Sequence, residues 1–166
     1  MNVRMTTSHG DILLELDAEK APVTVENFIS YVKSGHYDGT IFHRVIEDFM
    51  IQGGGLDQEM NDKPTNTSIQ NEADNGLSNL DATIAMARTA DPHSASAQFF
   101  INTTDNAFLD HRSPSEDGWG YCVFGKVIEG GDVVEKIEEV DTTTRNGYQN
   151  VPEELVIIVK MEVVEI

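Results

Sequence analysis

The chain has 166 residues, of which 39% are apolar, enough to build the core of one domain and too many for a disordered polyelectrolyte. Residues 1–83 carry 5 basic and 14 acidic groups and residues 84–166 carry 6 and 15, so each half contributes −9 to the net charge of −18. A surface of this charge repels phosphate backbones and anionic lipids, which makes nucleic acids and membranes poor candidate partners.

The first part of the chain predicts a β-hairpin followed by a helix. Apolar and polar residues alternate over 3–6 and again over 12–16, and the segment 8–11 between them has turn chemistry. Pro22 suits the first turn of a helix, and Gly35 is its expected end. One apolar stripe at i, i+3, i+4 and i+7 gives this helix a buried face: Val25, Phe28, Ile29 and Val32.

The rest of the chain predicts short strands and one more helix. Asp132 suits the N-terminus of a short helix over 132–138, whereas the segments 54–81 and 103–120 are polar and loop-like. Many antiparallel strands with two helices favour a mainly β fold, a closed barrel whose open ends the helices cover. The expected strands cover residues 41–46, 49–53, 82–87, 97–103, 121–128 and 155–164.

Cysteine content and hydropathy indicate the compartment. Cys122 is the only cysteine, which excludes an internal disulfide framework and a multi-cysteine zinc site. The first residues are polar and lack the apolar run of a secretory signal, and no stretch approaches the roughly 20 apolar residues of a membrane-spanning helix. We therefore expect a soluble protein of the cytoplasm.

Motifs of the common reaction classes are missing from the sequence. The glycines at 53–55 are not followed by Gly-Lys-Ser/Thr, the five histidines lack metal-ligand spacing, and no Gly-x-Ser-x-Gly elbow occurs. We therefore expect no metal and no cofactor. Two segments, 42–54 and 86–102, combine guanidinium and carboxamide side chains with Phe, Met and Ile. Ordinary strand packing with solvent-facing polar groups would account for both segments taken alone.

The same two segments resemble the signature of the cyclophilin-type peptidyl-prolyl cis–trans isomerases. The matching stretches run in order from about residue 3 to the final strand, so the resemblance covers essentially the whole chain. They are His9-Gly10-Asp11, Ala21-Pro22 with Asn27-Phe28, Phe42-His43-Arg44-Val45-Ile46, Phe49-Met50-Ile51-Gln52-Gly53-Gly54, Asn71-Glu72-Ala73 with Asn75-Gly76-Leu77, Met86-Ala87, Gln98-Phe99-Phe100-Ile101 and Val123-Phe124-Gly125-Lys126-Val127.

This resemblance implies a fold and an activity. The fold would be an eight-stranded antiparallel barrel capped by two α-helices, with residues 1–166 as a single isomerase domain. The activity would be rotation about X–Pro peptide bonds during protein folding, without a covalent intermediate. Ala87-Arg88 and Gly118-Trp119-Gly120-Tyr121-Cys122 look most like the small, single-domain bacterial cytoplasmic branch of the family.

The resemblance also assigns site residues. It places the catalytic arginine on Arg44, which would stabilise the pyramidal prolyl nitrogen, and a catalytic amide on Gln52. The implied substrate-binding residues are Phe49, Met50, Ala87, Arg88, Gln98, Phe100, Phe108, Leu109 and Tyr121.

Three positions, Arg88, Phe108 and Tyr121, depart from the better-known eukaryotic pattern, and Ala82 also differs from the usual residue. Arg88 stands where Asn is common, Tyr121 where His is common, and Ala82 where Gly is usual. Phe108 stands where Trp is common and lacks the indole N–H donor, so we expect cyclosporin-type ligands to bind only weakly.

The expected partners are proline-containing peptides and unfolded or flexible protein segments, and we expect a monomer. Two other readings stay open. The first is a binding module, in which the same pocket holds proline-containing loops and isomerisation is incidental. The second is a barrel that carries a small apolar ligand in a wide interior. We expect the bulky residues Phe28, Phe124, Ile157 and Val159 to fill that interior, which ranks this reading last.

Overall fold

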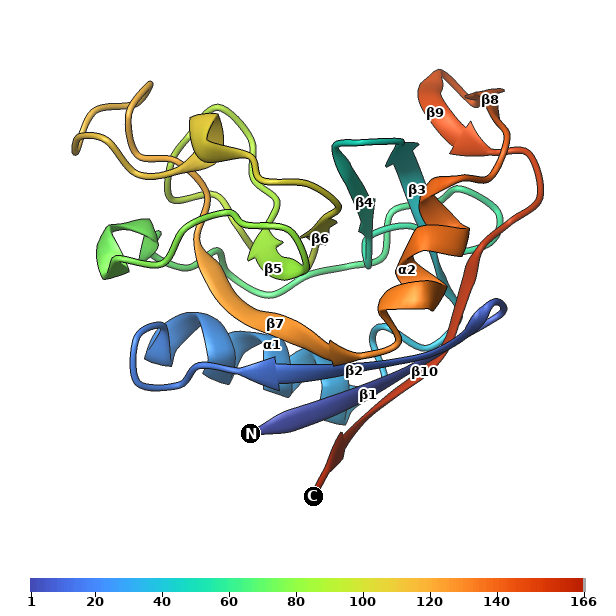
Figure 1. The fold of residues 1–166 in the computed structure, drawn as a ribbon, viewed down its shortest axis with the longest axis horizontal. Coiled ribbons are helices and arrows are strands. Elements are labelled where there is room, and N and C mark those ends of the chain that lie inside the picture. Colours follow the sequence, from blue (N-terminus) through green and yellow to red (C-terminus); the bar gives the residue numbers. More distant parts are fainter. Residues whose placement is uncertain (166) are drawn as a thin grey trace.

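The computed structural model describes residues 1–165 and has a closed barrel of antiparallel strands in the order β1-β10-β3-β4-β6-β5-β7-β2 (Figure 1). Two α-helices, α1 (Pro22–Ser34) and α2 (Gly131–Glu138), pack on it. The mainly β, eight-stranded barrel with two helices is therefore confirmed. The barrel strands are β1 (Asn2–Thr7), β2 (Gly10–Leu16), β3 (Thr40–Ile46), β4 (Met50–Gly53), β5 (Thr83–Met86), β6 (Phe99–Asn102), β7 (Val123–Glu129) and β10 (Ile157–Val164).

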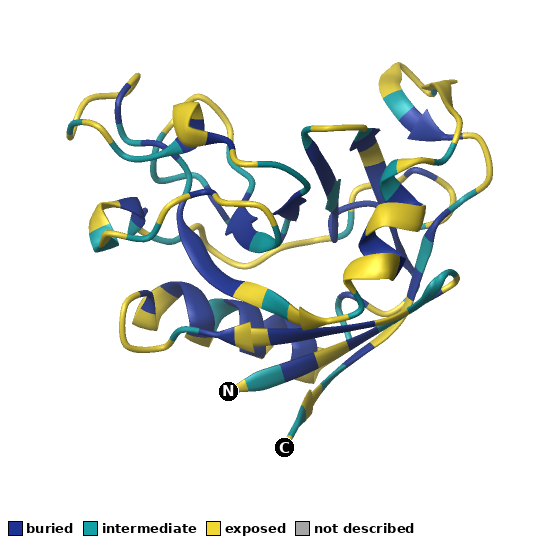
Figure 2. Cartoon of the chain, viewed as in Figure 1, coloured by how far each residue is buried: buried dark blue, intermediate teal, exposed yellow. Residues whose placement is uncertain are grey.

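Helix α1 buries the apolar stripe that its sequence spacing predicts. Its buried residues include Val25, Phe28, Ile29 and Val32, and Figure 2 shows α1 with both buried and exposed segments. Gly35 ends the helix in the left-handed conformation, with φ 77°, which glycine adopts without steric cost. No helix within residues 1–165 has the length and apolar character needed to cross a bilayer.

An aromatic cluster fills the barrel interior. Phe28 of α1 is fully buried, and its ring lies 5.1–5.8 Å, centroid to centroid, from the rings of Tyr37, Phe99 and Phe124. Such aromatic contacts stabilise a core beyond the area they bury. Phe28 and Phe124 thus fill the interior as expected.

The prediction that Ile157 and Val159 also fill the interior is wrong. Val159 is 53% exposed and Ile157 is only partly buried, whereas Ile158 and Met161 are buried. The reason is a β-bulge: Thr6 pairs with Lys160 and Thr7 with Ile158, which leaves Val159 as the extra residue of β10. A bulge shifts the alternation of side chains between the two faces of a strand.

Residues 142–152 form a small hairpin that the sequence analysis does not assign. Strands β8 (Thr142–Arg145) and β9 (Tyr148–Pro152) pair outside the barrel, and Figure 1 shows them beyond β3 and α2. Their turn residues, Asn146 and Gly147, both have positive φ, as a type I′ hairpin turn requires. Apolar alternation fails to reveal β8 because its first three residues are exposed Thr side chains.

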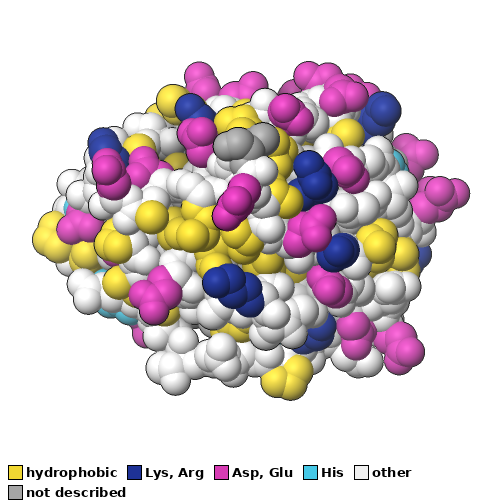
Figure 3. Space-filling model, turned by 90° about the horizontal axis from the view of Figure 1, so that it is seen from below, with side chains coloured by type: hydrophobic (Ala, Val, Ile, Leu, Met, Phe, Trp, Pro, Cys, Tyr) yellow, Lys and Arg dark blue, Asp and Glu magenta, His cyan; other side chains and the backbone are white. Residues whose placement is uncertain are grey.

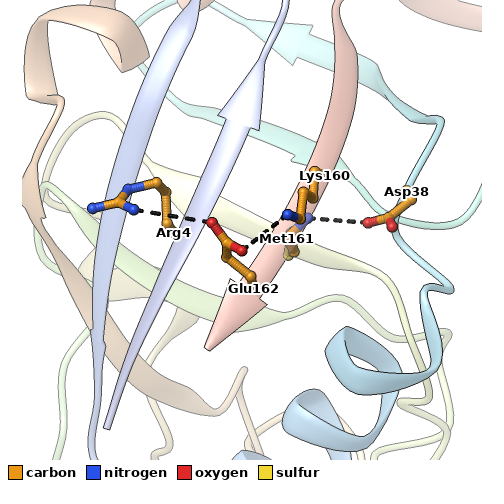
Figure 4. Close-up of polar contacts among 5 residues, drawn as sticks. All are labelled: Arg4, Asp38, Lys160, Met161 and Glu162. Carbon is orange, nitrogen blue, oxygen red and sulfur yellow. Dashed lines mark hydrogen bonds and ion pairs between the residues drawn. The ribbon is translucent and has the colours of Figure 1, made fainter. Parts of the chain in front are cut away.

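The outer face of β1 and β10 carries exposed ion pairs. Figure 3 shows this side of the molecule, with carboxylate groups spread among a few Lys and Arg side chains. Glu162 lies between Arg4 and Lys160, at 3.9 Å and 3.0 Å respectively (Figure 4). Their side chains are 40–58% exposed, so we expect each pair to contribute no more than about 1 kcal/mol.

Ala82, at a position where the family resemblance leads us to expect Gly, is held in the left-handed region at φ 70°. Its N–H donates to Asn102 O and its carbonyl accepts from Val127 N, both at 2.8 Å, so the conformation is fixed. Left-handed backbone costs alanine about 1–2 kcal/mol. We therefore expect Ala82→Gly to raise the free energy of unfolding by about 0.5–1 kcal/mol, after the greater entropy of glycine in the unfolded chain is subtracted.

Urea unfolding checks this prediction. The matched control is Ala18→Gly, in an exposed turn position without positive φ, which should be neutral or destabilising. Unchanged or reduced stability of the Ala82→Gly variant would show that the backbone at this position is not strained.

Candidate active site

A second β-bulge directs Arg44 away from the core. In the pairing of β3 with β4, Phe42 pairs with Gly53 and Arg44 with Gln52, so His43 is the extra residue of β3. Regular alternation would place Phe42 and Arg44 on one face. Because of the bulge, Phe42 is fully buried in the barrel core while Arg44 is exposed.

Along the neighbouring strands, successive side chains point alternately into the core and toward an outer cavity. On β6, Phe99 packs in the main core, whereas Phe100 belongs to a separate apolar cluster. On β4, Ile51 packs in the core and Met50 joins the cluster of Phe100. The buried members of this second cluster are Met50, Ala85, Phe100, Leu109 and Val123.

A row of polar side chains borders the apolar cluster. Arg44 Nη1 donates to Gln52 Oε1 over 3.3 Å, and Gln52 Nε2 donates to Gln98 Oε1 over 3.0 Å. The Arg44 guanidinium carbon lies 6.0 Å from the centroid of the Phe49 ring. These contacts restrict where the guanidinium can point, although the side chain is exposed.

Buried amides hold the opposite wall of the cavity in place. The short helix η2 (Ala107–Leu109) follows Asn106, which donates to Phe49 O over 2.9 Å and to Asn102 Oδ1 over 2.8 Å. Asn102 donates in turn to Asn79 Oδ1 over 3.1 Å. Since this network is buried, it ties the loop bearing Leu109 to the turn between β3 and β4 that bears Phe49.

Arg88 and Tyr121 form the remaining side of the cavity. The Arg88 guanidinium lies over the Tyr121 ring at 4.5 Å, a cation–π contact. Its Nε donates to Gly120 O over 2.9 Å and its Nη1 to Thr89 O over 2.8 Å. The Tyr121 ring meets Phe100 edge-on, with 5.7 Å between the ring centroids.

These walls enclose a groove of about 550 Å³. Ten of the eleven residues that the family resemblance assigns line it: Arg44, Phe49, Met50, Gln52, Ala87, Arg88, Gln98, Phe100, Leu109 and Tyr121. The eleventh, Phe108, is 65% exposed, stacks on Phe49 at 5.8 Å and lines a neighbouring pocket instead.

The groove is also lined by five residues that the sequence did not indicate: His43, Gly147, Tyr148, Gln149 and Asn150. Four of them come from the β8–β9 hairpin, whose Tyr148 ring meets the His43 ring edge-on at 5.9 Å. The Asn-Gly pair at 146–147 was the available signal for a hairpin, but nothing local to it indicates packing against β3.

His43 gives the protein a predicted pH dependence of stability. Burial, with a smaller effect of the neighbouring Arg44 charge, lowers the pKa of His43 from 6.5 to about 4. The unfolded chain therefore binds more protons than the folded one between these values, so stability is full above pH 6.5 and is lost as the pH falls toward 4. The shift corresponds to a loss of about 3 kcal/mol. Burial also lowers the pKa of His36, which acts with the same sign.

Urea unfolding at pH 7.5 and pH 4.5 tests this prediction on the wild type and His43→Gln. The variant should lose clearly less stability over this interval than the wild type. An equal loss in both proteins would assign the pH dependence to other groups.

The groove offers an apolar slot bordered by neutral amides and a guanidinium. Within residues 1–165, no three His, Cys, Asp or Glu side chains are grouped as metal ligands. Met50, Phe100 and Leu109 are at most 8% exposed, so they can hold a small apolar ring. Arg44, Gln52 and Gln98 provide hydrogen-bond donors and acceptors beside that ring.

The chain is similar to known proteins over nearly its whole length. Residues 2–163 match the family model of the cyclophilin type peptidyl-prolyl cis-trans isomerases. Peptidyl-prolyl cis-trans isomerase cyp18 of Streptomyces antibioticus is 62% identical over 94% of both chains. Peptidyl-prolyl cis-trans isomerase B of Escherichia coli is 53% identical over 98% of this chain and 99% of its own. A Cryptosporidium parvum enzyme of this type, crystallised in the presence of the dipeptide Ala-Pro, superposes with a TM-score of 0.81 at 26% identity, over 99% of both chains.

Proposed function

Since the chain belongs to the cyclophilin-type peptidyl-prolyl cis–trans isomerases, we propose that the groove beside Arg44 is its active site and that Arg44 stabilises the twisted X–Pro bond. The activity itself is that of the family. The observation that carries the residue assignment is the guanidinium, hydrogen-bonded to Gln52, in the same cavity as a buried apolar slot.

The reaction sets a clear requirement. Rotation about an X–Pro bond crosses a barrier of roughly 18–20 kcal/mol and takes tens to hundreds of seconds without a catalyst. To complete the rotation in milliseconds, the enzyme must raise the rate by about five orders of magnitude, which means lowering the activation free energy by roughly 7 kcal/mol. No covalent bond breaks, so the residues must hold one end of the amide and stabilise its twisted state.

Arg44 is placed to stabilise the twisted state of the amide. When the amide twists, resonance is lost, and the prolyl nitrogen becomes pyramidal and regains a lone pair. A guanidinium N–H can donate to that lone pair, and this contact is stronger in the twisted state than in the planar one. Gln52 acts as a positioning amide, since its Oε1 accepts from Arg44.

The apolar cluster holds the other end of the amide, the proline ring, in place. Met50, Phe100 and Leu109, with Phe49 beside them, hold the proline ring, and the flexible Met50 adapts to its shape. Gln98 and Ala87 bind the peptide backbone next to the ring, and Tyr121 and Arg88 close the groove. While the ring is held, the carbonyl before proline is free to rotate.

Other features fit the same proposal. The substrates are proline-containing peptides and flexible or unfolded segments, which the Ala-Pro dipeptide of the Cryptosporidium parvum crystal supports. Phe108 lacks an indole N–H and lies outside the groove, so cyclosporin-type ligands bind weakly. Residues 1–166 act as one domain and as a monomer, because a charge of −18 opposes self-association. The buried thiol of Cys122 suits a reducing cytoplasm.

The deciding experiment is protease-coupled isomerisation of a chromogenic Ala-Xaa-Pro-Phe peptide by the wild-type protein. We expect the cis-to-trans rate to rise in proportion to protein concentration. A peptide that binds without acceleration would contradict the proposal and favour a binding module.

A further inference from the structure

The charge inside the groove is opposite to that of the protein as a whole. The chain carries 29 acidic and 11 basic residues, yet no Asp or Glu of the described part lines the groove, and two of its lining residues are arginines. A side pocket of about 160 Å³ next to it has the same character. Its lining combines Arg88 with neutral polar side chains and one alanine: Gln52, Ala87, Thr89, Ser94, Ser96 and Gln98.

Arg88 stands where the cavities meet, because it lines the groove, the side pocket and a further pocket of about 260 Å³. Its two hydrogen bonds go to carbonyl oxygens, and its guanidinium stacks on the Tyr121 ring. None of the ion pairs within residues 1–165 includes Arg88. Guanidinium groups stay charged in proteins, so a positive charge is held in place without a partner.

Of the groove, the side pocket and the pocket of about 260 Å³, only the last has acidic side chains in its lining. Asp110, Glu116 and Asp117 line the pocket of about 260 Å³, together with Arg112. Asp110 Oδ1 accepts from the backbone N–H of Asn79 over 2.6 Å and from its side chain over 3.0 Å. These carboxylates repel an anion in that pocket, whereas the groove and the side pocket have no carboxylate in their lining and offer an anion the guanidinium.

We infer that the groove selects prolines flanked by an acidic residue, and that Arg88 recognises the carboxylate. This inference rests on the proposed function and names its substrate class. At about 0.15 M salt the Debye length is about 8 Å, so most of the −18 charge is screened from a bound peptide while a contact with Arg88 is not. A partly exposed ion pair of this kind raises kcat/KM by about two- to fivefold.

The test uses peptides with one proline and a single Glu, Gln or Lys at each position within three residues of it. NMR exchange between the cis and trans forms gives kcat/KM without a coupling protease, whose own charge preference would otherwise enter. At 0.15 M salt we expect Glu to exceed Gln by about two- to fivefold at one or more positions, and Lys to fall below Gln there. In 1 M salt the Glu preference should disappear.

Three variants test whether Arg88 causes the preference for Glu. Arg88→Gln should abolish the Glu-to-Gln ratio, and Arg88→Lys should retain most of it because the charge remains. Arg4→Gln, on the outer face of β1, changes the net charge equally and should leave the ratio unchanged. A ratio near one at every position, a ratio that survives in Arg88→Gln, or an equal loss in Arg4→Gln would overturn the inference. Turnover of the Gln peptides with a ratio near one would leave the proposed function standing, whereas no turnover of any peptide would contradict that function.

Discussion

Replacing Arg44 with alanine is expected to reduce kcat/KM for X–Pro isomerisation by a hundredfold or more. The removed guanidinium would donate to the prolyl nitrogen only as resonance is lost, like an oxyanion-hole donor worth about 3–4 kcal/mol. Peptide affinity should persist, since the apolar slot of Met50, Phe100 and Leu109 is untouched. The fold should persist as well, because the Arg44 side chain is exposed and its one side-chain hydrogen bond is to Gln52.

Two comparison variants make this result specific. Arg44→Lys keeps the charge but loses the planar donor group, so its turnover should also be strongly impaired. Arg4→Ala removes an arginine from the outer face of β1, where it pairs with Glu162, and should retain full turnover. Measured by protease-coupled isomerisation and by peptide titration, turnover close to wild type in Arg44→Ala would remove Arg44 from the mechanism. Lost turnover with lost affinity would mean that Arg44 mainly binds the peptide.

The sequence was a good guide where side chains follow a regular period. The stripe of α1 and the alternation of Ile12, Leu14 and Leu16 repeat without interruption, so each residue's face follows from its neighbours. The site residues came from the family resemblance, because Arg44 and Gln52 are 8 residues apart but Gln98 lies 46 residues beyond Gln52, and no local pattern joins the three. Only the pairing of β3, β4 and β6 brings them together.

The sequence was a poor guide where a β-bulge interrupts the alternation of buried and exposed residues along a strand. Both bulges leave buried residues three positions apart, Phe42 with Val45 on β3 and Ile158 with Met161 on β10. This spacing also fits helical or irregular structure, so it cannot reveal a bulge until the partner strand is known. The bulge on β10 overturned the expected burial of Val159. The bulge on β3 places Arg44 in the groove.

The contribution of the β8–β9 hairpin could not be predicted for a different reason. Its strands carry few apolar residues, and its position depends on contact with β3, a strand about 100 residues earlier in the chain. An Asn-Gly turn predicts a hairpin but not the surface on which it packs. Local sequence patterns therefore do not predict which polar segments, distant in the chain, pack beside the site.

Replacing Phe99 with alanine is expected to lower the free energy of unfolding by about 3–5 kcal/mol, whereas Phe100→Ala should mainly reduce turnover. Phe99 is fully buried, with its ring 5.5–6.0 Å from those of Phe28, Tyr37 and Phe42, so its removal leaves a sealed cavity. Phe100 is the adjacent residue of β6 and lines the open groove. Its removal would widen the apolar slot that we propose for the proline ring, in a place that solvent can fill. The loss of stability should therefore be smaller, but the slot would hold the ring less firmly.

Urea unfolding and kcat/KM, both measured on the two variants where they remain folded, separate these effects. The pair is matched in side chain, strand and solvent exposure, since both residues are at most 4% exposed, so only the direction of the side chain differs. A larger stability loss in Phe100→Ala, or a larger loss of turnover in Phe99→Ala, would contradict the assignment of one face of β6 to the core and the other to the active site. The expected pattern would show that the same alternation that builds the barrel also builds the proline slot on its outer side.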